Sequence, residues 1–311
     1  MGRKKIALIG GGNIGGMLAF LIAQRELGDA IILEIPGKET VAKGKALDIM
    51  ESTPHLNVDC KLVGTSSYDD IIGADVVVVT AGLPRKSGMS REDLLDVNLN
   101  IISSVATHVR EKTPNAFCII LTNPIDAMVY AFKQISGFHK SKVVGMAGVL
   151  DAGRFKAFVA MELGISIEDI SATILGSHGT TMVPLPRTCM VGGVPLTELL
   201  PDDTIAAIVE RTRNAGTEIV QLFGTGSAFI SPAASAIEMV EAYLKDKRRI
   251  MPVEAFLEGE YGIHGYYFGV PAIIGAGGVE KIIELQLTHQ ENEAMMNSLE
   301  AVKKIVAEIN L

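Results

Sequence analysis

One stretch decides the fold: Ile6-Ala7-Leu8-Ile9, followed by Gly10-Gly11-Gly12-Asn13-Ile14-Gly15. The apolar run predicts a buried strand, and the apolar-rich residues 17–27 predict a helix after the glycines. A glycine turn between a strand and a helix is the setting in which G-x-G-x-x-G binds a dinucleotide, with the pyrophosphate on the helix N-terminus. A purely structural turn is the alternative. As a dinucleotide site, the stretch would contact the cofactor through Gly10, Gly12, Asn13, Ile14 and Gly15.

An acidic residue follows the glycine motif at the spacing that is typical of dinucleotide-binding sites. Residues 30–33 predict a second strand, and Glu34 at its end lies about 20 residues beyond the last glycine. A carboxylate there accepts hydrogen bonds from the ribose hydroxyls and repels a 2′-phosphate, so it favours NAD over NADP. The alternative is that Glu34 is a solvated charge at a strand end. The spacing between the glycine motif and Glu34 favours the ribose site.

The rest of the chain divides into two parts. Apolar runs alternate with helical patterns up to residue 145, which predicts an α/β fold: a Rossmann-type doubly wound parallel sheet as the NAD-binding domain, residues 1–145. Residues 146–311 change in character and are expected to form a substrate-binding, catalytic α+β domain. The strands expected are 60–63, 76–79, 117–121, 142–145 and 171–175, with a hairpin at 188–196 and β-like runs in 250–285; the helices expected are 42–50, 91–112, 125–135, 151–163, 202–222, 234–244 and 292–309.

Composition excludes several classes of protein. The 311 residues carry a net charge of −8 without a basic cluster, which argues against nucleic acid as the main partner. No apolar run reaches the roughly 18 residues needed to cross a bilayer, and the N-terminal run is too short for a signal peptide. Three scattered cysteines resemble buried thiols more than a disulfide framework or a metal site. We therefore expect a cytoplasmic protein with no bound metal.

Candidate site residues follow the predicted strands. The polar stretch 83–93 carries Arg85 and Arg91 and favours an active-site lid, with an exposed surface loop as the alternative. Asn123 precedes a proline, which holds it extended, so that its amide could serve both cofactor and substrate; it could equally be a turn residue. A ligand crevice is expected at this edge, because it lies at the carboxyl ends of the strands in a doubly wound sheet.

The second half supplies a possible acid–base pair. Asp151 and Arg154 are three residues apart and share one face of the predicted helix. His178 lies between small residues at a strand end, which leaves its ring accessible. A lone histidine is more often a packing or surface residue, and that alternative stays open on the local sequence alone.

Together these motifs resemble the NAD-dependent malate dehydrogenases of the lactate-dehydrogenase-like group. The resemblance covers the chain almost end to end, from the glycine motif to Gly275-Ala276-Gly277-Gly278-Val279-Glu280. It is most specific in residues 83–98, 121–126, 145–155 and 175–186.

The resemblance assigns roles to the candidates in this sequence. It implies that His178 is the proton donor and acceptor, oriented by Asp151, and that Arg154 grips the substrate α-carboxylate. Arg91 is similar to the lid arginine that polarises the reacting carbonyl. Arg85 stands where an arginine binds a second carboxylate and where lactate enzymes typically have glutamine. The implied reaction is the reversible oxidation of (S)-malate to oxaloacetate, in the tricarboxylic acid cycle.

The same resemblance implies that Asn123 lies near substrate and nicotinamide and that Asn98 approaches the cofactor. It also implies a homotetramer, with a homodimer as the alternative. Two residues depart from the family pattern. Thr180 stands where aspartate usually follows His-Gly, and Glu34 replaces the usual ribose-binding aspartate.

Three rival functions remain. A dehydrogenase of another 2-hydroxy acid, such as lactate, is disfavoured by Arg85. An NAD-dependent glycosidase would need a metal held by cysteine and histidine, and Cys189 lies in the wrong motif. A non-catalytic NAD-responsive binding protein would have no reason to combine His178, Asp151 and Arg154 with the two lid arginines.

Overall fold

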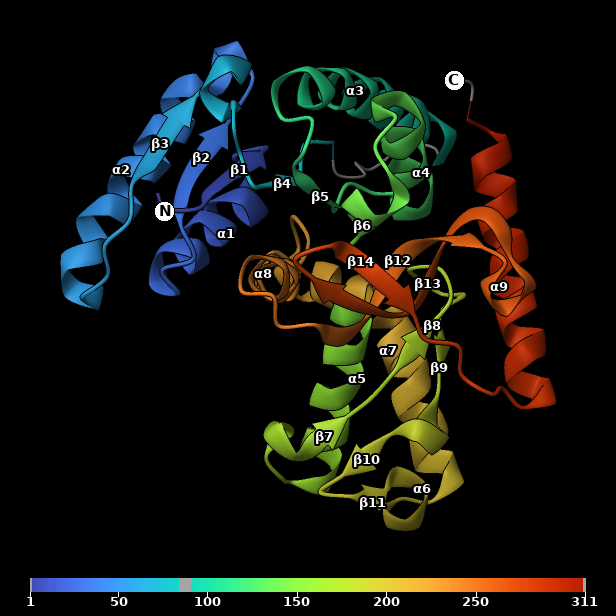
Figure 1. Cartoon of the computed structure of the whole chain (residues 1–311). Helices are drawn as coiled ribbons and strands as arrows, with labels where there is room; N and C mark the ends of the chain where they lie inside the picture. Colours follow the sequence, from blue (N-terminus) through green and yellow to red (C-terminus); the bar gives the residue numbers. More distant parts are fainter. Residues whose placement is uncertain (1, 84–90, 310–311) are drawn as a thin grey trace.

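In the residues that the structure describes, nine strands form one sheet that joins the two halves of the chain (Figure 1). The computed structural model describes residues 2–83 and 91–309, with residues 91–93 described by their backbone alone. The strand order is β14-β13-β12-β6-β5-β4-β1-β2-β3. The strands are β1 (Lys5–Ile9), β2 (Asp29–Leu33), β3 (Leu62–Thr65), β4 (Val76–Val79), β5 (Phe117–Ile120), β6 (Val143–Gly145), β12 (Arg249–Glu258), β13 (His264–Gly275) and β14 (Gly278–Ile282).

Helices cover both faces of the parallel part of this sheet, which confirms the predicted doubly wound fold. Strands β1 to β6 pair in parallel, and the order reverses between β1 and β4, where such sheets form their ligand crevice. Alternate residues of β1 enter two cores: Ile6 and Leu8 pack with α1 and α8, and Ala7 and Ile9 with α3 and α4. The helices are α1 (Asn13–Gln24), α2 (Glu39–Leu56), α3 (Arg91–Lys112), α4 (Ile125–Ser136), α5 (Gly148–Leu163), α6 (Leu196–Leu199), α7 (Asp202–Phe223), α8 (Ile230–Leu244) and α9 (His289–Ala307).

The second half both extends the sheet and builds a separate lobe. Strands β12, β13 and β14 are antiparallel, and β12 joins the parallel part at a single residue pair, Glu254 and Gly145. The β-like runs expected in residues 250–285 are therefore confirmed. Below the sheet in Figure 1, α5 and α7 pack beside short strands, namely β7 (Ile170–Ser171), β8 (Ile174–Leu175), β9 (Val183–Pro184), β10 (Met190–Val191) and β11 (Val194–Pro195).

Several predicted elements were wrong in their bounds, among them the helix expected at 17–27, which spans Asn13–Gln24. The strand expected at 60–63 begins two residues later, where Gly64 fits against α2: a Cβ there would lie 2.2 Å from the Ala42 carbonyl carbon. Helix α2 extends well beyond the expected 42–50 and ends at Asn57, whose left-handed backbone (φ 54°) stops it. The strand expected at 171–175 is two strands in different sheets, β7 and β8. No helix in the described ranges is long and apolar enough to cross a membrane.

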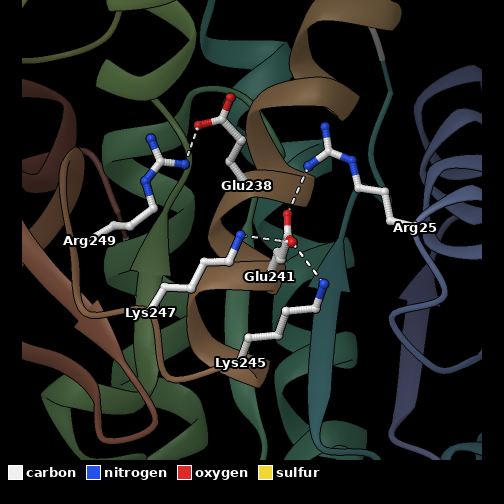
Figure 2. Close-up of polar contacts among 6 residues, drawn as sticks. All are labelled: Arg25, Glu238, Glu241, Lys245, Lys247 and Arg249. Atoms are coloured by element: carbon white, nitrogen blue, oxygen red, sulfur yellow. Dashed lines mark hydrogen bonds and ion pairs between the residues drawn. The ribbon is translucent and has the colours of Figure 1, made fainter.

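A charged network joins the two halves of the chain at α8 (Figure 2). The Glu241 carboxylate accepts hydrogen bonds from Arg25, just beyond α1, at 3.0 Å and from Lys245 at 2.9 Å, and Lys247 lies 2.8 Å away. The carboxylate is only 15% exposed, whereas its three partners are more exposed. Hydrogen bonds from Lys247 and Lys245 lower the pKa of Glu241 to about 2, against the smaller opposing effect of burial.

We predict that Glu241→Gln destabilises the protein at neutral pH. The carboxylate is ionised in the unfolded chain above a pKa of about 4.3 and in the folded chain above about 2, so its stabilising effect is present above the first value and is lost as pH falls toward the second. We expect a loss of about 1–2 kcal/mol at pH 7, because the partners are partly screened by solvent. Denaturant unfolding at pH 7, 4 and 3 measures the difference from wild type, which should shrink with pH.

Glu238→Gln is the matched control, since Glu238 lies on the same helix, is 40% exposed and pairs with Arg249 alone among the described residues, at 2.9 Å (Figure 2). An equal loss in both variants, or a difference that does not change with pH, would contradict the role of the Glu241 network.

Candidate active site

The glycine turn between β1 and α1 has the geometry of an anion site. Gly10 has a φ of +107°, and a Cβ on Gly15 would lie 1.9 Å from the Gly10 carbonyl oxygen, so both positions require glycine. Gly12 caps α1 without a side-chain hydrogen bond, no acidic residue lies in the first turn, and a Cβ on Gly12 would meet nothing within 4 Å. The N-terminus of α1 thus has neither a side-chain cap nor an acidic residue in its first turn, which fits a pyrophosphate.

Glu34 lies against this turn at the end of β2. The Gly11 N–H donates to its Oε1 at 2.8 Å, and the Ile35 N–H donates to its Oε2 at 3.2 Å. These bonds fix the carboxylate beside the turn and leave further lone pairs for two hydroxyl donors. The extra methylene of glutamate is thus accommodated by a bond back to the turn, and the position fits a ribose.

Sequence reasoning missed Lys45, which reaches the same turn from α2. Its ammonium donates to the carbonyl oxygens of Gly11 at 2.6 Å and Gly12 at 2.7 Å. Burial lowers the pKa of Lys45, and the nearby charge of Glu34 opposes that effect. Helix α2 also contains Lys43, and nothing in the local sequence distinguishes Lys45 from it. The glycine at position 16 is consistent with this contact, because a Cβ there would lie 3.2 Å from the Lys45 side chain.

The structure brings together the two residues predicted for catalysis, His178 and Asp151, and Arg154, which is predicted to bind the substrate. The Nδ1 of His178 lies 2.9 Å from Oδ2 of Asp151, and Nη1 of Arg154 donates to Oδ1 of the same carboxylate at 3.3 Å. Asp151 is 1% exposed, so its charge depends on these two partners. The shared helix face of Asp151 and Arg154 is confirmed, since both lie on α5 one turn apart.

The loop that carries His178 is tied to two other elements. Gly176, with a φ of +87°, donates through its N–H to the Gly269 carbonyl of β13, and the Ser177 N–H donates to the Ser298 hydroxyl of α9 at 2.9 Å. These bonds hold the backbone on both sides of the strand end, so the imidazole is placed before any ligand arrives. Such fixed placement is what an acid–base group requires.

Opposing effects set the charge of the site. Burial lowers the pKa of His178, but the charge and hydrogen bond of Asp151 outweigh it, and the pKa is raised above the ordinary value. Burial also lowers the pKa of Arg154, and Asp151 opposes that shift. The pair thus favours imidazolium, which is the form that can donate a proton.

His178 and Arg154 open onto one cavity of about 320 Å³. Thr180, the departure from the family pattern, lies on its wall and brings no charge there. The cavity is bounded by the glycine-turn helix, the end of β5 and helices α5, α7 and α8. Its walls are formed by Ile14, Leu121, Asn123, Met146, Leu150, Arg154, His178, Gly179, Thr180, Met182, Arg213, Gly216, Thr217, Ser227, Ala228 and Pro232.

Two asparagines meet at the carboxyl edge of the sheet. The Asn98 amide donates to the carbonyl oxygens of Asn123 at 2.7 Å and Leu83 at 3.2 Å, and its Oδ1 accepts from the Leu83 N–H at 2.8 Å. Asn98 is 1% exposed, so it holds the backbone of Asn123 and of Leu83 together. A contact between Asn98 and the cofactor stays a prediction.

The structure describes neither lid arginine side chain. Arg85 falls outside the described residues, and Arg91 is the first residue of α3, with its side chain outside them. Their predicted contacts with substrate stay predictions. In the described ranges, no group of three or more histidine, cysteine, aspartate or glutamate residues could hold a metal ion.

A glycine turn that leads into an uncapped helix N-terminus, and a His–Asp pair beside the neighbouring cavity, fit the class of dinucleotide-dependent oxidoreductases. Two family models match the chain: the lactate/malate dehydrogenase NAD binding domain over residues 4–145, and the lactate/malate dehydrogenase α/β C-terminal domain over residues 148–310. The chain belongs to the lactate/malate dehydrogenase family, and its cofactor is NAD.

Individual relatives of both substrate classes are similar to the chain. A malate dehydrogenase of Myxococcus xanthus is 53% identical over 310 residues, which cover 100% of this chain and 99% of the relative. The crystal structure of Cryptosporidium parvum malate dehydrogenase has a TM-score of 0.95 at 41% identity, covering 98% of each chain. The lactate dehydrogenase of that organism, complexed with lactic acid and the cofactor β-nicotinamide adenine dinucleotide, also has a TM-score of 0.95, at 43% identity, covering 99% of this chain and 98% of that one. The fold alone therefore does not select the substrate.

Proposed function

We propose that this protein catalyses the reversible oxidation of (S)-malate to oxaloacetate with NAD, as a cytoplasmic enzyme of the tricarboxylic acid cycle. One observation carries the proposal: the Nε of Arg154 is buried and has no acceptor among the described residues, directly beside the His178–Asp151 pair. An unpaired buried guanidinium N–H is costly. A substrate carboxylate would complete it, and Arg154 offers the planar fork that such a group fits.

His178 is the proposed acid and base. Its Nδ1 is engaged by Asp151, so Nε2 is the nitrogen available to the substrate. In malate oxidation Nε2 accepts the hydroxyl proton, and in the reverse direction the imidazolium returns it to the alkoxide oxygen. Asp151 stabilises the imidazolium and holds the ring orientation. When bound, NAD takes up or supplies the hydride.

The cofactor contacts proposed for Gly10, Gly12, Asn13, Ile14, Gly15 and Glu34 are supported by the open N-terminus of α1 and by the position of the Glu34 carboxylate. Asn123 and Ile14 line the same cavity as His178, which supports a position near both the nicotinamide and the substrate. Asn98 supports the proposed position of Asn123, because its side-chain amide donates a hydrogen bond to the Asn123 carbonyl oxygen.

Specificity for a dicarboxylate is proposed to depend on Arg85, with Arg91 polarising the carbonyl. The support is chemical: oxaloacetate has a second carboxylate, and an arginine is its natural partner in a site closed from water. The name of the 53% identical Myxococcus xanthus relative agrees with this choice. A lactate dehydrogenase is the alternative, because a lactate enzyme matches the fold equally well.

A homotetramer is proposed as the working assembly, with a homodimer as the alternative. Large apolar side chains are exposed on several helices, among them Leu47 of α2 (61%), Met161 of α5 (68%) and Leu222 of α7 (78%). Contacts between subunits would remove such side chains from water. Sedimentation equilibrium of the purified protein should give four times the chain mass of 33.1 kDa, and a monomer would contradict the proposal.

We predict that wild-type protein oxidises NADH rapidly with oxaloacetate and slowly with pyruvate, and that Arg85→Gln reverses much of this preference. Loss of the second carboxylate's partner should reduce kcat/KM for oxaloacetate by about 100-fold or more and increase that for pyruvate. NADH absorbance follows both reactions, and a sugar phosphate tests the glycosidase alternative. Arg85→Lys, which keeps the charge but not the fork, is the control. An unchanged ratio of oxaloacetate to pyruvate rates in Arg85→Gln would exclude the specificity role.

We predict that His178→Asn lowers kcat for oxaloacetate reduction by about 1,000-fold or more, while the Kd for NADH stays within a few-fold of wild type. The variant removes the proton donor and keeps a polar group of similar size beside Asp151. Single-wavelength kinetics and NADH fluorescence titration measure the two quantities. Wild-type turnover would exclude His178 as the acid–base group, and a parallel loss of NADH binding would point to a disturbed fold.

A further inference from the structure

Lys45 reaches from α2 to the glycine turn between β1 and α1. Its ammonium donates to the Gly11 carbonyl oxygen at 2.6 Å and to the Gly12 carbonyl oxygen at 2.7 Å. The Lys45 side chain is half-buried, and a Cβ on Gly16, in the first turn of α1, would lie 3.2 Å from its Cδ. A lysine side chain usually carries its ammonium into water. Here the ammonium instead binds two successive backbone carbonyl groups, and it therefore fixes the orientation of two peptide groups in the turn.

The direction of these carbonyl groups decides where the next N–H groups point. The peptide bonds after Gly11 and Gly12 are trans, and in a planar trans peptide the C=O and the following N–H point in opposite directions. Because both carbonyl oxygens face Lys45, the N–H groups of Gly12 and Asn13 point away from the Lys45 ammonium. Both belong to the N-terminus of α1, where N–H groups have no partner within the helix. These are the donors that an anion on the turn would use.

A run of three glycines does not hold this orientation by itself. Glycine has no Cβ and adopts a wide range of backbone angles, so the peptide group between Gly11 and Gly12 could rotate. A rotated peptide group would present its carbonyl oxygen, which repels a pyrophosphate, in place of its N–H. Two side chains oppose the rotation. The Gly11 N–H donates to Glu34 at 2.8 Å and its carbonyl oxygen accepts from Lys45, so the peptide groups on both sides of Gly11 are held.

We propose that Lys45 is a positioning residue of the NAD site: its ammonium holds the Gly11 and Gly12 carbonyl oxygens and thereby keeps the N–H groups of Gly12 and Asn13 directed at the cofactor pyrophosphate. The inference rests on the cofactor contacts proposed above for the glycine turn. Lys45 acts through the backbone of the turn, and it requires no contact of its own with NAD.

Direct attraction between the ammonium and the pyrophosphate is the competing explanation. The two effects respond differently to salt. Salt screens the attraction between charges that are separated by solvent, whereas short hydrogen bonds inside the protein hold the backbone orientation at any ionic strength. A positioning effect on cofactor affinity therefore persists at high salt.

The experiment compares ligands with and without a pyrophosphate. Fluorescence titration gives the Kd for NADH, and displacement of NADH gives the Kd for ADP-ribose and for adenosine. Lys45→Met removes the ammonium and keeps a side chain of similar length. It should weaken NADH and ADP-ribose by about 10-fold, because the turn is no longer preorganised, and leave adenosine, which has no phosphate, as in wild type. The ratio of variant to wild-type Kd for NADH should be equal at about 0.05 M and about 0.5 M NaCl.

Two further variants serve as controls. Lys43→Met is the matched control, since Lys43 lies on the same helix, is 61% exposed and pairs with Glu39 at 2.6 Å; it should bind all three ligands as wild type does. Gly12→Ala tests the turn itself. A Cβ on Gly12 would meet nothing within 4 Å, so the variant should fold, and a methyl group beside the pyrophosphate should weaken NADH.

Four outcomes would overturn the inference. An equal loss of adenosine affinity in Lys45→Met would indicate a general disturbance, and a loss that disappears at high salt would indicate direct attraction by charge. If Gly12→Ala weakens NADH and Lys45→Met does not, the inference fails alone and the proposed contacts of the turn stand. If Gly12→Ala has no effect, the proposed contacts of the turn fail as well. Should Lys45→Met not fold, Lys45→Ala makes the same predictions with the strongest helix former.

Discussion

Burial of the Asp151 charge is the constraint on which the rest of the site depends. An isolated carboxylate removed from water is strongly destabilising, and a residue that is 1% exposed must be neutralised by groups held close to it. His178 and Arg154 meet this requirement at 2.9 and 3.3 Å. The same two bonds orient the imidazole of His178 and the guanidinium of Arg154. The partners that the buried Asp151 carboxylate requires are therefore the two groups that the substrate would contact.

That constraint explains how three distant segments converge. Asp151 and Arg154 lie on the first two turns of α5. His178 lies on a loop that is hydrogen-bonded to β13 and α9, and the glycine turn lies between β1 and α1. Parallel strands present their carboxyl ends at one edge, and helices that begin there place their N-terminal turns beside the same edge. Asp126 lies in the first turn of α4 and Asp151 in the first turn of α5, where the helix dipole favours a negative charge.

Much of this was visible in the sequence, because local patterns carry it. Strand, glycine turn and helix are encoded within residues 6–27, and the helical spacing of Asp151 and Arg154 is local as well. What stayed hidden depends on contacts between distant residues. Lys45 could not be separated from other lysines without knowing that α2 crosses the glycine turn. Glu254 could not be recognised as buried until the antiparallel strands were placed beside β6.

The pairing of β12 with β6 has a mechanical consequence. The family models divide the chain between residues 145 and 148, yet the sheet continues across that division, and one hydrophobic cluster contains both Ile6 and Ile274. A hydrogen bond between Arg25 and Glu241 also joins these two segments, away from the shared core (Figure 2). A hinge between the two halves would have to break the sheet and open this shared core. The two predicted domains therefore share one sheet and one hydrophobic core, and a motion of one half against the other would disturb both.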